Sequence, residues 1–184
     1  LRTQYRMAPR IAHLNSTLFY EGRVESHSSL LEQPLDRNSL VWVDHAHLEG
    51  NGEETSKANP GEAQLASALG RIIRERYPTD SIGILTFYSK QRELIQKHLV
   101  ELGCHDISVL TVDSSQGREF DHCILSLVRA NTHRRAGFTT RPARVNVAIS
   151  RAKTSLVVAG NYATLRHTRV WSQVHASAVR ATAQ

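Results

Sequence analysis

Residues 107–128 read ISVLTVDSSQGREFDHCILSLV, so that two apolar runs enclose a polar segment. Both runs, 107–112 and 123–128, are mostly apolar and do not alternate strictly with polar residues, and a third run at 156–159 is wholly apolar. Strands without polar alternation are covered on both faces, which is typical of parallel sheets flanked by helices. The sequence therefore predicts an α/β fold built on a mainly parallel sheet.

Helices and further strands are predicted on the N-terminal side of this stretch. Residues 5–20 repeat apolar side chains at steps of three and four, the pattern of a helix with one buried face. Residues 59–62, Asn-Pro-Gly-Glu, provide a cap, a first-turn proline and a carboxylate for a helix that runs to Arg76. A strand at 82–87 and a helix at 89–102 then begin a βαβ unit. A short strand is expected at 40–43, between surface loops at 26–39 and 45–59.

The composition is that of an ordinary globular chain with an excess of positive charge. The 184 residues are 40% hydrophobic and 22% charged, which excludes disordered and collagen-like chains. The 23 Lys and Arg exceed the 17 Asp and Glu by a formal charge of +6, which favours a polyanionic partner such as nucleic acid or a nucleotide. No linker, repeat or low-complexity tract divides the chain, so residues 1–184 are expected to form one domain.

The sequence favours an intracellular protein, cytoplasmic or nuclear, without a membrane anchor. No stretch approaches 18 consecutive apolar residues, and residues 1–20 carry no signal-peptide pattern. Cys104 and Cys123 are too few for a disulfide framework, which favours a reducing compartment. Because the chain begins with Leu1 rather than Met, we expect it to be a piece of something longer.

The polar segment 111–121, TVDSSQGREFD, is the first candidate site. We expect it at the carboxyl end of a strand, where ligands of open α/β sheets bind. The hydroxyls of Thr111, Ser114 and Ser115 suit contacts with phosphate. Gly117 lets the backbone approach an anion closely, and Glu119 suits a ribose hydroxyl. The alternative is a turn that caps a short helix.

Two other segments carry arginines beside apolar patterns. In RVNVAISRAK, residues 144–153, a helical apolar face leaves Arg151 directed outward, where its guanidinium suits bidentate contact with phosphate. The alternative is a solvated Arg at a helix end. In QYRMAP, residues 4–9, the ring of Tyr5 and the guanidinium of Arg6 stand side by side at a helix start.

Taken in order, QYRM, TVDSSQGREFD and RVNVAISRAK closely resemble the motifs of one family. They resemble the second RecA-like domain of superfamily 1 helicases of the up-frameshift and DNA-replication-helicase type. The resemblance spans Leu1 to about Trp171, and several motifs in a fixed order are far more specific than any one of them. It implies a RecA-like, three-layer domain of the P-loop NTPase type that forms the C-terminal half of a helicase motor.

The resemblance also implies roles for single residues. Tyr5 would stack near the adenine of ATP, and Glu119, with Gly117 beside it, would contact the nucleotide. Arg6 and Arg151 would reach the γ-phosphate as arginine fingers, which are the catalytic groups that this domain supplies. The nucleic-acid backbone would be contacted by three further residues, Thr111, Ser114 and Gln91.

The implied partners are ATP, single-stranded nucleic acid and a first RecA-like domain. No GxxxxGK[ST] loop and no acidic Mg²⁺-binding pair occurs in this sequence, and both belong to the first RecA-like domain. We therefore expect Mg²⁺ to be held by that other domain, and this chain alone to be inactive as an ATPase. The resemblance implies translocation from 5′ to 3′, on RNA or on DNA.

Two alternative functions compete with the interpretation that this chain is half of an ATP-dependent helicase. One is a non-catalytic nucleic-acid-binding or interaction module derived from a helicase. The other, a Rossmann-type enzyme, lacks a GxGxxG after a strand. No metal site is predicted, because His45, His47 and His133 are expected to be solvated loop residues. The oligomeric state stays open.

Overall fold

The computed structural model describes residues 3–31, 39–53 and 56–183. Its first part holds β1 (Thr3–Gln4), α1 (Pro9–Phe19), β2 (Glu25–Ser26), α2 (Ser28–Leu31), β3 (Leu40–Asp44), α3 (Pro60–Arg76), β4 (Ile82–Thr86), α4 (Ser89–Glu101) and β5 (Ser108–Thr111). It continues with η2 (Asp113–Ser115), β6 (Phe120–Ser126), η3 (Gly137–Thr140), α5 (Pro142–Ile149), β7 (Ala152–Gly160), α6 (Tyr162–Leu165), α7 (Arg169–Ser177) and β8 (Val179–Thr182).

Six strands form one sheet in the order β5-β4-β6-β7-β3-β8, and every pair in it is parallel. The predicted α/β fold with a mainly parallel sheet is confirmed. β1 and β2 form a separate parallel pair, in which Thr3 lies opposite Glu25. Ser26 of β2 and the helix α2 lie in the segment 26–39 that was expected to be loop, and residues 32–38 of that segment lie outside the described residues.

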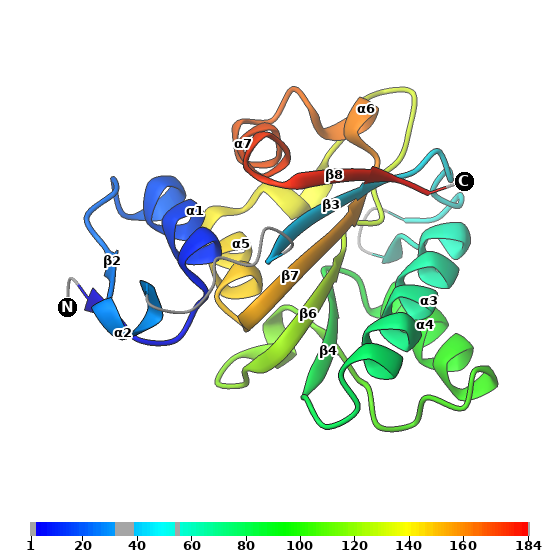
Figure 1. Ribbon diagram of the computed structural model, residues 1–184. Coiled ribbons are helices and arrows are strands. Elements are labelled where there is room, and N and C mark those ends of the chain that lie inside the picture. The colour runs from blue at the N-terminus through cyan, green and yellow to red at the C-terminus, as the bar shows by residue number, and fades with distance from the viewer. Residues whose placement is uncertain (1–2, 32–38, 54–55, 184) are drawn as a thin grey trace.

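Helices cover both faces of the sheet, which gives the three expected layers (Figure 1). On one face α3 and α4 enclose a core that includes Ile84, Ile95 and Ile124. On the other face α1, α5 and α7 enclose a larger core around Trp42 and Trp171. The central strand β6 is buried at Phe120 and again from His122 to Ser126, whereas β5 is half-buried along its length because it lies at the edge of the sheet.

Local sequence explains where the helices begin. Pro9 and Pro60 both occupy the first turn of a helix, where the missing amide proton is not needed. Asn59 caps α3, since its side chain accepts a hydrogen bond from the amide of Glu62 at 3.0 Å. The first helix therefore starts at Pro9 rather than at the expected residue 5, and residues 5–8 form a turn that reaches the start of β7.

The two edges of the sheet carry different parts of the motifs. At the amino edge, where parallel strands begin, Phe120 of β6 lies opposite Ala152 of β7. At the carboxyl edge, where strands end, Thr111 of β5 lies opposite Thr86 of β4. The segment between Thr111 and Phe120 therefore crosses from the carboxyl edge to the amino edge. The sequence placed the whole segment at the carboxyl edge, and this expectation is wrong for its second half, which includes Glu119.

Candidate nucleotide and nucleic-acid site

A cavity of about 530 Å³ lies at the amino edge of the sheet. It is lined by Gln4, Tyr5, Arg6, Met7, Glu119, Ser150 and Lys153. Its walls come from three segments that are far apart in the sequence and that correspond to the three motifs. The structure therefore brings Tyr5, Arg6 and Glu119 together in one cavity.

The turn that presents Tyr5 and Arg6 is held by the side chain of Gln4. Its carbonyl oxygen accepts from the amides of Arg6 and Met7, at 2.9 and 2.7 Å, and its amide donates to the carbonyl of Met7 at 2.9 Å. The same amide donates to Ser26 Oγ at 2.7 Å. Gln4 is therefore a positioning residue, a role that its place in the QYRM motif did not indicate.

Tyr5 and Arg6 are both available to a ligand. The ring of Tyr5 is 66% exposed and stacks on His27 with 4.5 Å between ring centroids. Arg6 Nε lies 2.8 Å from Glu119 Oε2, and both side chains are about half exposed. An ion pair with this exposure is worth at most about 1 kcal/mol, so a charged ligand can replace either partner at little cost.

Arg151 follows Ser150, which lines this cavity, and it does not lie on a helix. α5 ends at Ile149, and Arg151 occupies the turn before β7, which corrects the expected outward position on a helix. Its guanidinium folds back onto the protein and donates to the carbonyls of Val147 and Arg118 and to Ser150 Oγ, at 3.1, 2.8 and 3.0 Å. Partial burial, and then the neighbouring charge of Arg6, lower the pKa of Arg151 from its ordinary value.

Gly117 shapes the segment that leads to Glu119. Its φ of +82° lies in the left-handed region, which glycine adopts without strain. No other atom lies within 4 Å of the position that a Cβ would take there, so the backbone is open to approach. Ser115, expected to offer a free hydroxyl, is instead buried and donates to the carbonyl of Val112 at 2.7 Å.

Thr111 and Ser114 lie at the carboxyl edge, at the end of β5. The hydroxyl of Thr111 donates to Ser114 Oγ at 2.9 Å, and Ser114 Oγ donates to the carbonyl of Thr111 at 3.1 Å. The segment from Asp113 to Ser115 is a short 3₁₀ helix. The turn alternative is thus realised in the local geometry, with Ser114 exposed and Thr111 half-buried.

Gln91 is fully buried, so a direct contact with nucleic acid is not available to it in this structure. Its carbonyl oxygen accepts from the amide of Asn59 at 2.8 Å. Its amide donates to Ser126 Oγ at 3.0 Å and to the carbonyl of Asn59 at 3.2 Å. Gln91 therefore connects the starts of α3 and α4 to the end of β6 inside the protein.

Glu62 is the centre of this buried network, and sequence analysis missed it. One carboxylate oxygen accepts from Ser126 Oγ and from the amide of Val128, at 2.5 and 2.7 Å, and the other lies 2.6 Å from His45 Nε2. His45 was expected to be a solvated loop residue, but it is buried because it pairs with Glu62. The Asn-Pro-Gly-Glu pattern predicted the helix start but could not show that this Glu points into the core.

The network holds a strained turn at the end of β6. Val128 has a φ of +70°, and the amide of Arg129 donates to the carbonyl of Leu127 at 2.7 Å, which is a γ-turn. A β-branched residue in this region costs on the order of 1–3 kcal/mol. Glu62 binds the amide of Val128, and Asn59 donates to its carbonyl at 3.2 Å, so both peptide groups of the strained residue are held by side chains.

Neither a metal-binding cluster nor a membrane-spanning helix is found in the described part of the chain. Within it, no group of three or more His, Cys, Asp or Glu side chains is placed to hold a metal ion. No described helix is long and apolar enough to cross a membrane. 

Comparisons with known proteins agree with the motifs. The AAA domain family model AAA_12 matches residues 1–163. The ATP-dependent helicase NAM7 of Saccharomyces cerevisiae is 30% identical over 95% of this chain, and the alignment covers 20% of that protein. The regulator of nonsense transcripts 1 homolog of Arabidopsis thaliana is 31% identical over 94% of this chain and 15% of its own length. The chain thus spans a fifth or less of these two relatives.

A solved structure shares the fold. The C-terminal domain of a possible DNA helicase from Lactobacillus plantarum WCFS1 superposes with a TM-score of 0.60 and 14% identity, over 96% of this chain and 98% of that one. An identity this low supports the fold alone, and the family rests on the matching model and on the sequence relatives. The chain belongs to the AAA_12 family of AAA domains, as a RecA-like helicase domain of the up-frameshift type of superfamily 1.

Proposed function

We propose that this chain is the C-terminal RecA-like domain of an ATP-dependent superfamily 1 helicase or translocase. The observation that supports this most is the amino-edge cavity, in which Tyr5, Arg6 and Glu119 meet with Arg151 beside them. An aromatic ring, a carboxylate and two guanidiniums are the groups needed for a base, a ribose and a triphosphate. ATP would bind between this cavity and a first RecA-like domain in the same polypeptide.

Each residue of the cavity then has a chemical task. Tyr5 stacks on the adenine, and Glu119 accepts from a ribose hydroxyl, with Gly117 leaving room beside it. Arg6 and Arg151 approach the γ-phosphate and stabilise the charge that develops during phosphoryl transfer. Bound Mg²⁺ would neutralise phosphate charge, and its ligands are expected in the first domain. This chain alone is then inactive as an ATPase.

Arg151 has to exchange partners to act in this way. Its guanidinium is held by two carbonyls and a hydroxyl, which are neutral acceptors. Phosphate oxygens carry negative charge, so a contact with phosphate adds charge–charge attraction and two-pronged geometry that a carbonyl or hydroxyl acceptor does not provide. Closure of a first domain that carries ATP would therefore draw Arg151 from Val147 and Arg118 toward the γ-phosphate, which makes hydrolysis depend on closure.

Single-stranded nucleic acid would cross the carboxyl edge of the sheet. Thr111 and Ser114 present hydroxyls there for the backbone of RNA or DNA, and Gln91 supports this edge from within. Closing and opening of the two domains would then move them along the strand. The proposed setting is an intracellular one, in keeping with Cys104 and Cys123, which are both free thiols.

A second candidate function is favoured by the same contacts of Arg151. A non-catalytic nucleic-acid-binding or interaction module derived from a helicase would keep this guanidinium as a structural link between α5 and the segment before β6. For such a module, Arg151 would contribute to stability only.

Substitution of Arg151 distinguishes between the two candidate functions. In the longer protein that carries this chain, Arg151→Ala should lower ATP hydrolysis on the order of 10³-fold or more and change nucleotide affinity little. Arg151→Lys should also be poor, because an ammonium does not reproduce the planar two-pronged contact. Turnover and nucleotide affinity are measured on the same variant, with wild type beside it. Near wild-type turnover of Arg151→Ala would reject the finger role.

A further inference from the structure

Charge is distributed very unevenly along this chain. All 17 Asp and Glu lie at or before Asp121, and the 63 residues that follow contain ten Arg and Lys and no carboxylate side chain. Three of these cations are paired with carboxylates of the first part, in the ion pairs Arg129–Glu49, Arg144–Asp113 and Lys153–Asp121. The remaining cations give the C-terminal third of the chain a strong positive potential.

Five of the remaining cations come from two segments that pack side by side. The amide of Asn131 donates to Thr164 Oγ1 at 2.9 Å, and Trp171 Nε1 donates to Thr139 Oγ1 at 3.3 Å, so the loop 131–142 lies against the segment 162–171. Within the described chain, none of the five guanidiniums has a carboxylate at ion-pair distance. We call them the basic patch: Arg134, Arg135, Arg141, Arg166 and Arg169.

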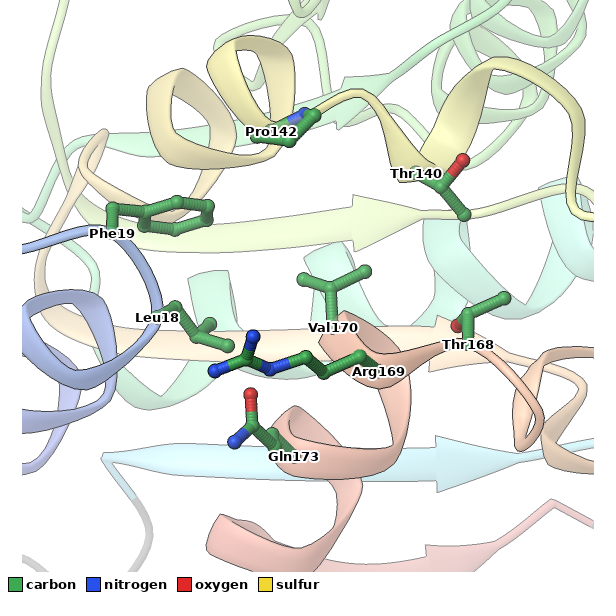
Figure 2. Close-up of a pocket in the computed structure, with 8 residues that line it drawn as sticks. All are labelled: Leu18, Phe19, Thr140, Pro142, Thr168, Arg169, Val170 and Gln173. Atoms are coloured by element: carbon green, nitrogen blue, oxygen red, sulfur yellow. The ribbon is translucent and has the colours of Figure 1, made fainter. Parts of the chain in front are cut away.

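A partly apolar cavity opens beside the basic patch (Figure 2). Its volume is about 250 Å³, which is smaller than the roughly 300–1,000 Å³ of sites for drug-sized ligands and suits a single nucleobase. Figure 2 shows Phe19 and Pro142 on one side and Val170 facing them, with the side chain of Arg169 extended along the cavity. Gln173 lines the same cavity, and its Oε1 is buried without a hydrogen-bond partner among the described residues.

Arg141 adds a flat surface next to this cavity. Its guanidinium lies over the ring of Phe138, 4.9 Å from the centroid, and Arg144 lies 6.0 Å from the same centroid. Arg141 is exposed, so the face of its guanidinium that points away from Phe138 is open. Single-stranded nucleic acids are held in this way, with bases stacked on aromatic rings or guanidinium planes and phosphates on nearby cations.

The patch is continuous with the predicted nucleic-acid contact at the carboxyl edge. Asp113, in the turn between Thr111 and Ser114, accepts from Arg144 Nη2 at 2.7 Å. Arg144 lies in the first turn of α5, three residues after Arg141. A single-stranded nucleic acid that contacts the hydroxyls of Thr111 and Ser114 and continues across α5 would therefore reach the basic patch next.

We propose that the basic patch and the cavity of Figure 2 form a second contact region for the same single strand, with phosphates on Arg141 and Arg169 and one base in the cavity. This rests on the proposed function and extends it beyond the three motifs. Gln173 would supply the polar group that meets the edge of the base. An acidic protein segment would use the cations but not the base-sized cavity, so we favour nucleic acid.

Charge reversal tests the phosphate contacts in the 184-residue chain. Arg141 precedes α5 and Arg169 begins α7, and a negative charge at a helix start is favourable, so the double variant Arg141→Glu/Arg169→Glu should fold. The matched control is Arg76→Glu/Lys97→Glu, which changes the net charge equally on α3 and α4, the layer on the opposite face of the sheet (Figure 1). Binding of labelled 12-nucleotide DNA and RNA is followed by fluorescence anisotropy.

The patch variant should lose about tenfold or more in affinity at 50 mM salt, and the control no more than about threefold, because distant charges are screened. Loss of two phosphate contacts should also flatten the slope of log K against log salt by about 1.4. Equal losses in the two variants would overturn the proposal. Failure of the wild-type chain to bind any strand would instead remove the nucleic-acid part of the proposed function itself.

An abasic oligonucleotide tests whether the cavity binds a base. The wild-type chain should bind an abasic strand of equal length more weakly than the ordinary strand. Gln173→Leu, which keeps the volume but removes the amide, should weaken only the ordinary strand, by roughly three- to fivefold, the value of one modest hydrogen bond. Unchanged affinity of this variant for the ordinary strand would overturn the base contact. Competition by polyglutamate that equals competition by an unlabelled strand would reassign the patch to an acidic protein segment.

Discussion

The amino edge and the carboxyl edge of the sheet hold their charged groups in opposite ways. At the amino edge the ion pair Arg6–Glu119 is about half exposed and lies in an open cavity. At the carboxyl edge the pair His45–Glu62 is fully buried, and Glu62 also binds a hydroxyl and a backbone amide. An exposed pair can exchange partners at little cost, whereas the loss of one member of a buried hydrogen-bonded pair leaves buried polar atoms unsatisfied.

This contrast distinguishes the exposed pair, which suits ligand binding, from the buried network, which stabilises the fold. The amino-edge groups are placed for a ligand that comes and goes, which suits nucleotide turnover. The carboxyl-edge network keeps Val128 in a strained turn and fixes the loop that follows β6. We therefore expect substitutions in the buried network around Glu62 to act on stability, and those at the Arg6–Glu119 pair to act on function with little effect on stability.

The largest effect on stability is expected at Glu62. Glu62→Ala should lower the free energy of unfolding by about 3–5 kcal/mol, because three buried polar groups, His45 Nε2, Ser126 Oγ and the amide of Val128, lose their partner at about 1–3 kcal/mol each. Denaturant unfolding of the 184-residue chain measures this. The control is Glu75→Ala on the same helix, where an exposed pair with Arg71 at 3.5 Å should contribute about 0.5 kcal/mol or less. Similar losses in both variants would show that the network does not support the fold.

Gln91 should have the next largest effect. Gln91→Ala leaves the amide of Asn59 without its buried acceptor and removes the donor to Ser126 Oγ, which costs about 1–3 kcal/mol. Gln96→Ala, at an exposed position of the same helix, is the control and should change stability by less than about 0.5 kcal/mol. If Gln91→Ala instead kept full stability and lost strand binding, Gln91 would be a contact residue after all.

Much of this architecture follows from periodicity and end signals in the sequence. Continuous apolar runs predict β6 and the buried half of β7, and the residues around Pro60 predict the start of α3. These signals are local, and each has a physical cause that acts within one turn or one strand. The meeting of Tyr5, Arg6 and Glu119 in one cavity was predictable only from the resemblance, since the three residues are far apart in the sequence.

The remaining features depend on where tertiary packing directs a side chain or a loop, and local sequence patterns do not encode this. Glu62 has the spacing of a capping carboxylate, yet its side chain points to β6, where Ser126 Oγ and the amide of Val128 donate to it. Arg151 follows a helical pattern, but α5 ends two residues earlier. The segment after Thr111 crosses the sheet, so Glu119 lies at the edge opposite to the expected one.

A pH effect is expected at the amino edge, from Asp121. The hydrogen bond with Lys153 and those from Ser81 hold the pKa of the Asp121 carboxyl well below its ordinary value. A carboxyl whose pKa is lower in the folded state stabilises the fold above its unfolded pKa of about 4, and this contribution is lost as the pH falls through the folded value. Asp121→Asn should flatten the fall in stability below pH 4 by at most about 1 kcal/mol, because the pair is partly exposed. Lys153→Met should flatten it similarly, and an unchanged pH profile in both would contradict the assignment.

The smallest effect on stability is expected for the pair Arg6–Glu119. Arg6→Ala should change the free energy of unfolding by about 0.5 kcal/mol or less, because both side chains are about half exposed and salt screens them. A double-mutant cycle with Glu119→Ala measures the coupling, which should fall further between 50 mM and 500 mM salt. A coupling above about 2 kcal/mol would mean that the pair is a structural link, like His45–Glu62. A small coupling, together with a large loss of ATP hydrolysis in the longer protein, would instead place Arg6 among the groups that act on a ligand.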